Sequence, residues 1–389
     1  MAGCSSDSSG GSTPSAGGSG GSAGESGSGG ADLDGSADAD ASIDPDAAGG
    51  TGGGQAEAGQ DGACTPGATQ CEGNAVLTCL ATAQWDTAKE CIGLTPTCKA
   101  GVCEPLASGP SCVGLAPTCG PAGNASCCAS SLVPGGTFKR SYDAVTFVDD
   151  TYPATVSTFV LDVYEVTVGR FRKFIDGHPA HLPAAGAGKN PNNPADTGWD
   201  LAWNGNIPLD QSALSSAIKC GGTNQTWTDD AGLNESRPIT CVTWYEALAF
   251  CIWDGGRMPT EAEWNYAASG GAEQRVFPWS NPPTAELVDA TYAVYAKVPI
   301  AAVGTKSPLG DGRWGHADLG GNAWEWVLDS YVTPYANPCT DCSNQTTAAA
   351  RVFRGGGASF DASGLLASKR NDYSPSSRTD VGIRCARQP

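Results

Sequence analysis

Seventeen cysteines constrain the fold of this 389-residue chain more than any other feature of its sequence. Thiols are rare at this density in the cytosol, where they are kept reduced, and are common in oxidising compartments. The cysteines therefore predict an extracytoplasmic protein that is stabilised by disulfide bonds. Sixteen of them follow residue 62, an even number that permits complete pairing, and the seventeenth is Cys4.

Cys4 lies in the run Met-Ala-Gly-Cys-Ser-Ser. Small residues before a cysteine and a polar tract after it are typical of the end of a bacterial lipoprotein signal. The basic and apolar parts of such a signal do not precede Cys4, so we expect the natural reading frame to begin further upstream. Cys4 is then the predicted lipidation site, and a free cysteine in a chance context is the alternative. No later segment is long and apolar enough to span a bilayer, so this anchor is the only expected membrane contact. The predicted location is the outer membrane or the cell surface.

Residues 1–62 combine this remnant of a lipoprotein signal with a tract of Gly, Ser, Ala and Asp. From residue 5 onward the tract holds ten acidic residues and no basic ones, about half of the net charge of −19. Such a composition cannot bury enough apolar surface to offset the entropy lost on ordering, so we predict a disordered tether. The acidic balance argues against a nucleic-acid partner.

Residues 63–105 form a cysteine-rich module in which Ala75–Thr78 is the clearest strand. About forty residues cannot build an adequate apolar core, so three disulfides are expected to stabilise it. A zinc site is the weaker alternative, because the module has no histidine and no CxxC pair, in which two residues separate the cysteines. The sequence leaves the pairing open. The six cysteines are Cys64, Cys71, Cys79, Cys91, Cys98 and Cys103.

Residues 106–131 are a cysteine-containing linker. The adjacent Cys127 and Cys128 are not expected to bond each other. Separate upstream partners would instead fix the linker to itself or to the domain that follows, and the candidates are Cys112 and Cys119.

Residues 132–389 have the pattern of a globular α+β domain with short elements. A helix is predicted to open at Thr167, because Phe171, Phe174 and Ile175 then share one face. Nearly all of the eleven tryptophans fall in this domain, which predicts packing on aromatic side chains.

Two further helix starts carry capping boxes, which pair a hydroxyl residue with a carboxylate residue three positions later. The hydroxyl accepts from the backbone N–H of the carboxylate residue, and the carboxylate accepts from the backbone N–H of the hydroxyl residue. Thr243 is followed by Glu246, and Thr260 by Glu263. The glycine pair 255–256 is expected to end the first of these helices.

The long segment 178–235 is rich in Pro, Asn and Gly and is expected to be an ordered loop. It contains His178 and His181, which we place on an exposed loop. With His316 they are the only histidines of the chain, and no pattern supports an iron or zinc site at any of them.

The motifs RMPTEAEW and GNAWEW, within six blocks between residues 133 and 387, resemble the formylglycine-generating enzyme (sulfatase-modifying factor) family. The resemblance implies a C-type-lectin-like variant of an α+β fold, with low regular secondary structure and ligands bound by loops. It also implies a disulfide between Cys251 and Cys385. The cysteine module and linker are similar to those of lipoproteins common in myxobacteria.

With that bond assigned, the remaining cysteines of the domain would pair as Cys220 with Cys241 and Cys339 with Cys342. The last pair is a CxxC motif, for which a structural loop disulfide is the first interpretation and redox or metal chemistry the alternative.

The family oxidises a cysteine of an unfolded sulfatase segment to formylglycine with copper(I) and oxygen. Two thiolates hold the copper, because this soft ion prefers sulfur. In this chain no cysteine lies between Cys342 and Cys385, and Gly357 stands where the family pattern places a serine. Copper is therefore not expected.

The resemblance also implies a structural calcium ion at the GNAWEW loop, held by oxygen ligands. The matching positions are Asp318 and Glu325 as carboxylates, with carbonyls from Gly321 and Ala323. The alternative is that Glu325 only stabilises a buried turn.

We predict a non-catalytic scaffold at the cell envelope that binds an unknown peptide, protein or glycan. The first alternative is a family enzyme with altered chemistry, a formylglycine-generating or nonheme-iron-type oxidase of a protein or small-molecule thiol. The second is a purely structural surface protein. The basic residues among the predicted groove positions would favour an anionic partner. The groove candidates are Ser359, Phe360, Lys369, Arg370, Asp372, Tyr373 and Arg378.

Overall fold

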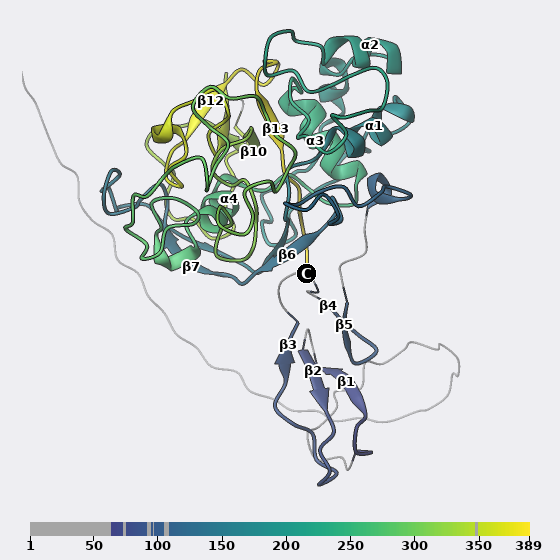
Figure 1. The fold of residues 1–389 in the computed structure, drawn as a ribbon, viewed down its shortest axis with the longest axis vertical. Coiled ribbons are helices and arrows are strands. Elements are labelled where there is room, and N and C mark those ends of the chain that lie inside the picture. Colours follow the sequence, from purple (N-terminus) through teal and green to yellow (C-terminus); the bar gives the residue numbers. More distant parts are fainter. Residues whose placement is uncertain (1–63, 73–74, 92–94, 96, 105–108, 347–348) are drawn as a thin grey trace, which may run out of the picture. The chain divides into compact units, whose positions relative to one another are not determined.

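The computed structural model describes residues 64–72, 75–91, 95, 97–104, 109–346 and 349–389 (Figure 1). The predicted tether of residues 1–62, with Cys4, lies outside the described residues. Within them, no helix is both long and apolar enough to cross a bilayer.

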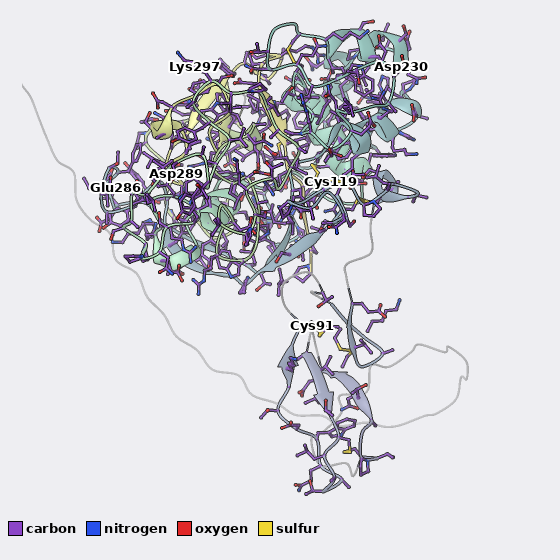
Figure 2. All side chains as sticks on the ribbon, viewed as in Figure 1. Cys91, Cys119, Asp230, Glu286, Asp289 and Lys297 are labelled. Atoms are coloured by element: carbon purple, nitrogen blue, oxygen red, sulfur yellow. A yellow bond between two sulfur atoms is a disulfide. The ribbon has the colours of Figure 1, made fainter. Side chains whose placement is uncertain are left out.

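The cysteine-rich module contains two small antiparallel sheets and three disulfides, as predicted. One sheet has the order β1-β2-β3, and the other is a hairpin of two strands. The predicted strand Ala75–Thr78 is confirmed as β2. The strands are Thr69–Glu72 (β1), Ala75–Thr78 (β2), Lys89–Glu90 (β3), Thr97–Lys99 (β4) and Val102–Glu104 (β5). The disulfides are Cys64–Cys79, Cys71–Cys98 and Cys91–Cys103 (Figure 2).

The segment predicted as a linker contains the short 3-10 helix Pro110–Cys112 (η1) and two disulfides. Cys128 bonds Cys112 and Cys127 bonds Cys119, so the adjacent cysteines do have separate upstream partners. Ser111 is fully buried, and its backbone N–H donates to the Asp254 carboxylate at 2.9 Å. These contacts make this segment an integral part of the large domain.

The large domain is built from short strands in three groups. A four-stranded sheet has the order β12-β11-β10-β13, in which only the β10–β13 pair is parallel. A three-stranded sheet, β14-β9-β6, joins the two ends of the domain, and β7 pairs with β8. The strands are Ser130–Val133 (β6), Gly136–Lys139 (β7), Pro153–Val156 (β8), Phe159–Asp162 (β9), Trp324–Ser330 (β10), Arg351–Arg354 (β11), Asn371–Tyr373 (β12), Val381–Ile383 (β13) and Ala386–Arg387 (β14).

Among the described residues of the domain, four α-helices and three further 3-10 helices lie between these strands. In Figure 1, α1, α2 and α3 gather on one side of β10 and β13, where their apolar residues share one core. The helices are Val168–Asp176 (α1), Gln211–Ala217 (α2), Trp244–Trp253 (α3), Glu261–Ala268 (α4), Leu201–Asn206 (η2), Gly271–Glu273 (η3) and Ala362–Gly364 (η4).

The predicted helix starts are confirmed. Thr167 caps α1, and both capping boxes are formed in full, by Thr243 with Glu246 and by Thr260 with Glu263. The core is aromatic, as expected, since five of its largest fully buried side chains are Trp199, Trp244, Trp264, Trp324 and Trp326.

Two expectations for residues 178–235 were wrong. The segment is not only loop, because it contains η2 and α2. Asp210 begins α2 by accepting a hydrogen bond from the Ala213 N–H at 2.8 Å. His178 is not exposed: its side chain is buried, and its ring forms a hydrogen bond with the Pro208 carbonyl at 2.6 Å.

Three further disulfides link segments of the large domain. Cys251 of α3 bonds Cys385 in the turn between β13 and β14. The other two are Cys220–Cys241 and Cys339–Cys342. These are the pairs that the resemblance and the remaining cysteines implied.

Candidate binding site around Gly357

Gly357 follows β11 at a point where two polar groups face one small space. A Cβ atom added to Gly357 would lie 3.4 Å from the Nε1 atom of Trp324 and 3.6 Å from the Oδ2 atom of Asp380. It would also approach the Cδ1 atom of Trp324 to 3.0 Å, which is too close. Gly357 and Trp324 are buried and Asp380 is nearly so, and the absence of a side chain at Gly357 lets the indole and the carboxylate lie close to the backbone here.

Trp324 is the first residue of β10 and is fully buried. Its ring is held edge-on against Phe353 at 5.0 Å and against Phe360 at 5.2 Å between centroids. Buried indole N–H groups usually find an acceptor. The Nε1 atom of Trp324 is buried and finds none among the described residues, so a donor without a partner lies next to Gly357.

Asp380 immediately precedes β13 and is only 8% exposed. Within the described part of the chain, no other side chain donates a hydrogen bond to its carboxylate, and burial raises its pKa. A carboxylate with so few donors is costly to keep charged. The site thus combines one donor that has no partner among the described residues with one buried carboxylate that accepts from its own backbone N–H.

Phe360 and Tyr373 form the more exposed border of this region, and each is 36% exposed. Tyr373 stacks on Phe353 with 4.6 Å between ring centroids, and Phe353 in turn packs on Trp324. Burial, together with the carboxylates of Asp380 and Asp372, raises the pKa of Tyr373. Aromatic faces and a carboxylate therefore occupy the same part of the surface.

The structure brings together only some of the predicted groove residues. Phe360 and Tyr373 belong to the site described above, and the hydroxyl of Ser359 donates to Asn224 at 2.8 Å. Asp372 lies in β12, opposite Val352 of β11.

The basic residues predicted for the groove are largely committed elsewhere. Arg378 pairs with Glu246 at 2.5 Å, and Arg370 pairs with Glu261 at 2.8 Å. The backbone carbonyl of Lys369 accepts from Arg354 at 3.1 Å. Carboxylates therefore neutralise both guanidinium groups, and the expectation of an anionic partner stays a prediction.

The predicted calcium residues lie in a buried hydrogen-bond network in which Glu325 forms an ion pair with Arg384. The Glu325 carboxylate accepts from the Arg384 Nη2 and Nε atoms at 2.7 and 3.1 Å, and from the Trp264 indole at 2.7 Å. Asp318 accepts from the Gly304 N–H at 2.6 Å, and burial raises its pKa to about 6. These contacts give Glu325 a structural role of its own.

Glu165 is a third buried carboxylate in this network. It accepts from the Asn322 amide at 2.7 Å and from the Ala323 N–H at 2.9 Å, while the Gly321 N–H donates to Gly355. Burial, then Asp318, raises the pKa of Glu165 well above its usual range. The surplus of acid would suit a cation. Across the described ranges, however, no three His, Cys, Asp or Glu side chains are arranged to hold a metal, so calcium stays a prediction.

Copper(I) does not fit the Gly357 site. The groups there are an indole, a carboxylate and aromatic rings, whereas this ion prefers thiolates. All sixteen cysteines from Cys64 onward are bonded in eight disulfides. His181 stacks on Trp253 with 4.5 Å between centroids.

Trp324 and Asp380 are functional candidates that the sequence analysis missed. Trp324 was noted only as part of the GNAWEW motif, and a single aspartate before a strand has no distinctive pattern. The available signal was Gly357 at the position of the family's serine, because a glycine permits a close approach of other groups to the backbone.

The short strands, capped helices and aromatic core define a C-type-lectin-like α+β domain whose loops carry the candidate site. The chain belongs to the family described as the sulfatase-modifying factor enzyme 1-like domain, which matches residues 116–389. The match begins inside the segment predicted as a linker. Eight disulfides fit an oxidising, extracytoplasmic compartment.

Curated relatives include active and inactive proteins. The mouse formylglycine-generating enzyme is 26% identical over 65% of this chain and 73% of its own length. The mouse inactive C-alpha-formylglycine-generating enzyme 2 is 29% identical, over 54% of this chain and 71% of its own. Among solved structures, PvdO from Pseudomonas aeruginosa aligns with a TM-score of 0.47 and 20% identity, over 67% of this chain and 94% of its own.

Proposed function

We propose that this domain is a non-catalytic binding module that recognises a basic side chain of a peptide or protein ligand at the Gly357 site. The observation that carries the proposal is the buried carboxylate of Asp380, to which no other side chain among the described residues donates, near the unpartnered indole N–H of Trp324. Phe360 and Tyr373 offer the ring surfaces against which such a side chain would lie.

The chemistry of these groups favours arginine as the recognised residue. A guanidinium group is planar, donates to carboxylates and stacks on aromatic faces. It would neutralise Asp380, whose raised pKa reflects burial without an adequate partner. The Trp324 N–H needs an acceptor, and a backbone carbonyl of the ligand would supply one. A peptide meets both requirements, whereas a neutral glycan meets only the second.

The absence of catalytic thiols supports a binding role in place of copper-dependent oxidation. No cysteine lies between Cys342 and Cys385 in the sequence, and neither of these two is free in the structure. The proposal further includes lipidation of Cys4, which would anchor the module at the cell envelope through the tether. It also includes one structural calcium ion at the network of Asp318.

Peptide titration tests the recognition step. The full chain is titrated by calorimetry with a blocked Gly-Arg-Gly peptide and with the matched citrulline peptide, which keeps the shape but lacks the charge. We expect the arginine peptide to bind at least tenfold more tightly. The Asp380→Asn variant should lose this preference, and the control Asp230→Asn, at an exposed aspartate outside the site, should keep it. Equal binding of the two peptides, or none by either, would contradict the proposal.

Two measurements test the absence of catalysis and the metal content. A cysteine-containing sulfatase-motif peptide, incubated with the protein, copper, oxygen and a reductant, should yield no aldehyde. Metal analysis of the disulfide-intact protein should find calcium but no stoichiometric copper or iron. Aldehyde formation, or bound copper or iron, would favour the alternative of an oxidase with altered chemistry.

A further inference from the structure

The Cys339–Cys342 disulfide closes a CxxC loop that the backbone holds in place by other means. The Thr155 N–H of β8 donates to the Cys339 carbonyl at 2.9 Å, and the Asp341 N–H donates back to the Thr155 carbonyl at 2.9 Å. The Asp341 carboxylate accepts from the Ser157 N–H at 2.6 Å. Because these bonds do not involve sulfur, the loop can keep its position when the disulfide opens.

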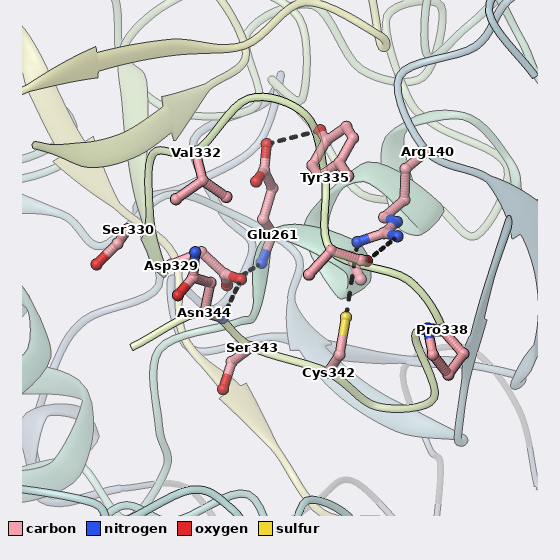
Figure 3. Close-up of a pocket in the computed structure, with 12 residues that line it drawn as sticks. Arg140, Glu261, Asp329, Ser330, Val332, Tyr335, Pro338, Cys342, Ser343 and Asn344 are labelled. Carbon is pink, nitrogen blue, oxygen red and sulfur yellow. Dashed lines mark hydrogen bonds between the residues drawn. The ribbon is translucent and has the colours of Figure 1, made fainter. Parts of the chain in front are cut away.

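A buried positive charge lies directly beside one of the two sulfurs. The Nη1 atom of Arg140 is 3.7 Å from the Sγ atom of Cys342 (Figure 3). Arg140 is 5% exposed, and its guanidinium lies over the ring of Tyr335 at 4.5 Å. Its Nη2 atom donates to Asn337 and to the Ala336 carbonyl. In the described part of the molecule no carboxylate lies within ion-pair distance of Arg140, so its charge is available to Cys342.

A titratable carboxyl group shares the same small pocket. Arg140, Asp329, Tyr335 and Cys342 are among the residues that line this pocket of about 50 Å³ (Figure 3). Burial, and then the Glu261 carboxylate, raises the pKa of Asp329 to about 7. Asp329 can therefore exchange a proton near neutral pH, within the space that Cys342 borders.

A second and wider hollow adjoins the other cysteine. It has a volume of about 480 Å³, and Cys339, Pro153, Thr155 and Asn337 contribute to its wall. This hollow is large enough for the side chain and backbone of a cysteine-containing peptide. The two cysteines thus border different spaces: Cys339 is 5% exposed where it meets the wider hollow, and Cys342 is half-buried beside the charged groups.

We propose that Cys339–Cys342 is a redox-active disulfide that oxidises the thiols of a peptide dithiol. A thiolate of the peptide attacks the Sγ atom of Cys339 from the wider hollow. The Sγ–Sγ bond breaks, Cys342 leaves as a thiolate beside Arg140, and a mixed disulfide joins the peptide to Cys339. The second peptide thiolate then attacks the peptide sulfur of that bond and releases Cys339. The peptide becomes a disulfide, the protein becomes a dithiol, and the two protons of the peptide thiols pass to the two cysteines.

The direction of attack follows from the position of Arg140. Thiol–disulfide exchange is faster when the leaving thiol has a lower pKa, and a nearby cation lowers it. Cys342 is thus the better leaving group and Cys339 the attacked atom. Asp329 supplies or accepts the proton at Cys342 as the thiolate forms and disappears. This activity is independent of the binding proposed at Gly357.

Graded reduction of the full oxidised chain tests the proposal. Under limiting reduced peptide dithiol, freed thiols are alkylated and located by peptide mapping. Cys339 and Cys342 should be labelled at least tenfold faster than the cysteines of the other seven disulfides, with one peptide disulfide formed for each pair opened. Opening of this pair only together with the others would overturn the proposal.

Variants test the role assigned to Arg140. Arg140→Gln should slow the opening of Cys339–Cys342 at least threefold without changing the rates of the other disulfides. Lys139→Gln, an exposed neighbour that pairs with Asp150, is the matched control and should have no effect. Unchanged opening in a folded Arg140→Gln protein would contradict the assignment.

A trapping experiment remains informative if Arg140→Gln fails to fold. In Cys342→Ser, Cys339 has no internal partner and should form a stable mixed disulfide with an oxidised two-cysteine peptide. Cys339→Ser should form less of this adduct, because Cys342 does not border the wider hollow. No adduct at Cys339 would show that the peptide does not reach it, and the proposal would fall.

Discussion

Arg384 and Glu325 form an ion pair in which both side chains are fully buried. The remaining guanidinium hydrogens of Arg384 are donated to the carbonyls of Asp162, Val163 and Ala317. Every donor is therefore satisfied only while the carboxylate is present. Burying such a pair contributes little to stability, but removal of one partner leaves an uncompensated charge.

Glu325→Gln should accordingly lower the free energy of unfolding by about 3–5 kcal/mol. Urea unfolding at pH 7 measures this loss. Glu273→Gln is the control, because Glu273 pairs with Arg275 at the partly exposed surface, where about 0–1 kcal/mol is expected. A loss below about 1 kcal/mol for Glu325→Gln would mean that Arg384 finds another counter-charge. That result would contradict the role assigned to Glu325.

Asp329 gives the domain a pH dependence that opposes ordinary acid denaturation. Its carboxylate faces the charges of Glu261, Arg370, Arg351 and Arg140. Burial is the largest influence, and the pKa rises from 3.8 to about 7. Because the folded pKa is raised, the stability it provides is complete below about pH 4 and is lost as the pH rises through 7.

The Asp329→Asn variant should therefore show a flatter decline of stability between pH 4 and pH 8. The wild-type decline due to this group amounts to as much as about 4 kcal/mol. At pH 4 the variant should be less stable than the wild type, because one amide oxygen cannot accept from both the Glu261 and the Asn344 N–H groups. Unfolding is followed at each pH by tryptophan fluorescence. Ser343→Ala, in the same pocket without a titratable group, should leave the slope unchanged.

At the scale of elements, helix starts were predictable because their signals are local. The boxes of Thr243 and Thr260 lie within four residues of sequence and appear unchanged in the structure. The helix α2 escaped prediction because its seven residues bury only Leu214, which gives no periodic face. Strands of two to four residues are equally hard to predict from the sequence, because two alternations of apolar and polar residues are not distinctive.

The candidate site was only partly predictable, for a different reason. Phe360 and Tyr373 were identified by their proximity in sequence to Gly357. Asp380 reaches the same point through the parallel pairing of β13 with β10, a contact between segments more than fifty residues apart. Conversely, Arg370 lies near Tyr373 in sequence but pairs with Glu261 of α4. Pairing partners of this kind depend on the tertiary fold.

The capping box of α4 permits a quantitative test at this scale. Thr260 is fully buried, and its hydroxyl accepts from the Glu263 N–H at 3.1 Å. Thr260→Ala leaves that N–H without an acceptor and should cost about 1–2 kcal/mol in urea unfolding. Ser216→Ala, an exposed hydroxyl in the last turn of α2, should change stability by less than about 0.5 kcal/mol. Equal effects of the two substitutions would contradict the capping role.

At the scale of the whole molecule, one covalent bond unites the helical part of the domain with its closing strands. Cys251 lies in α3, and Cys385 separates β13 from β14, at a sequence separation of 134 residues. The strand β14 also pairs with β9 near the start of the domain, so the bond fixes three distant segments at once. Both cysteines are fully buried, which protects the bond from external thiols.

Loop-closure entropy predicts how much this bond stabilises the folded state. A closed loop of more than a hundred residues reduces the entropy of the unfolded chain by the equivalent of about 4.7 kcal/mol or slightly more. The double variant Cys251→Ala/Cys385→Ala should lose about that amount, together with some packing in the core. Removing Cys119 and Cys127, only eight residues apart, should cost less on the same scale, about 3 kcal/mol or below. If the order of the two losses were reversed in urea unfolding, local packing at Cys119 and Cys127 would outweigh chain entropy. The closing strands would then be held mainly by the β9–β14 pairing and by the buried Arg384 network.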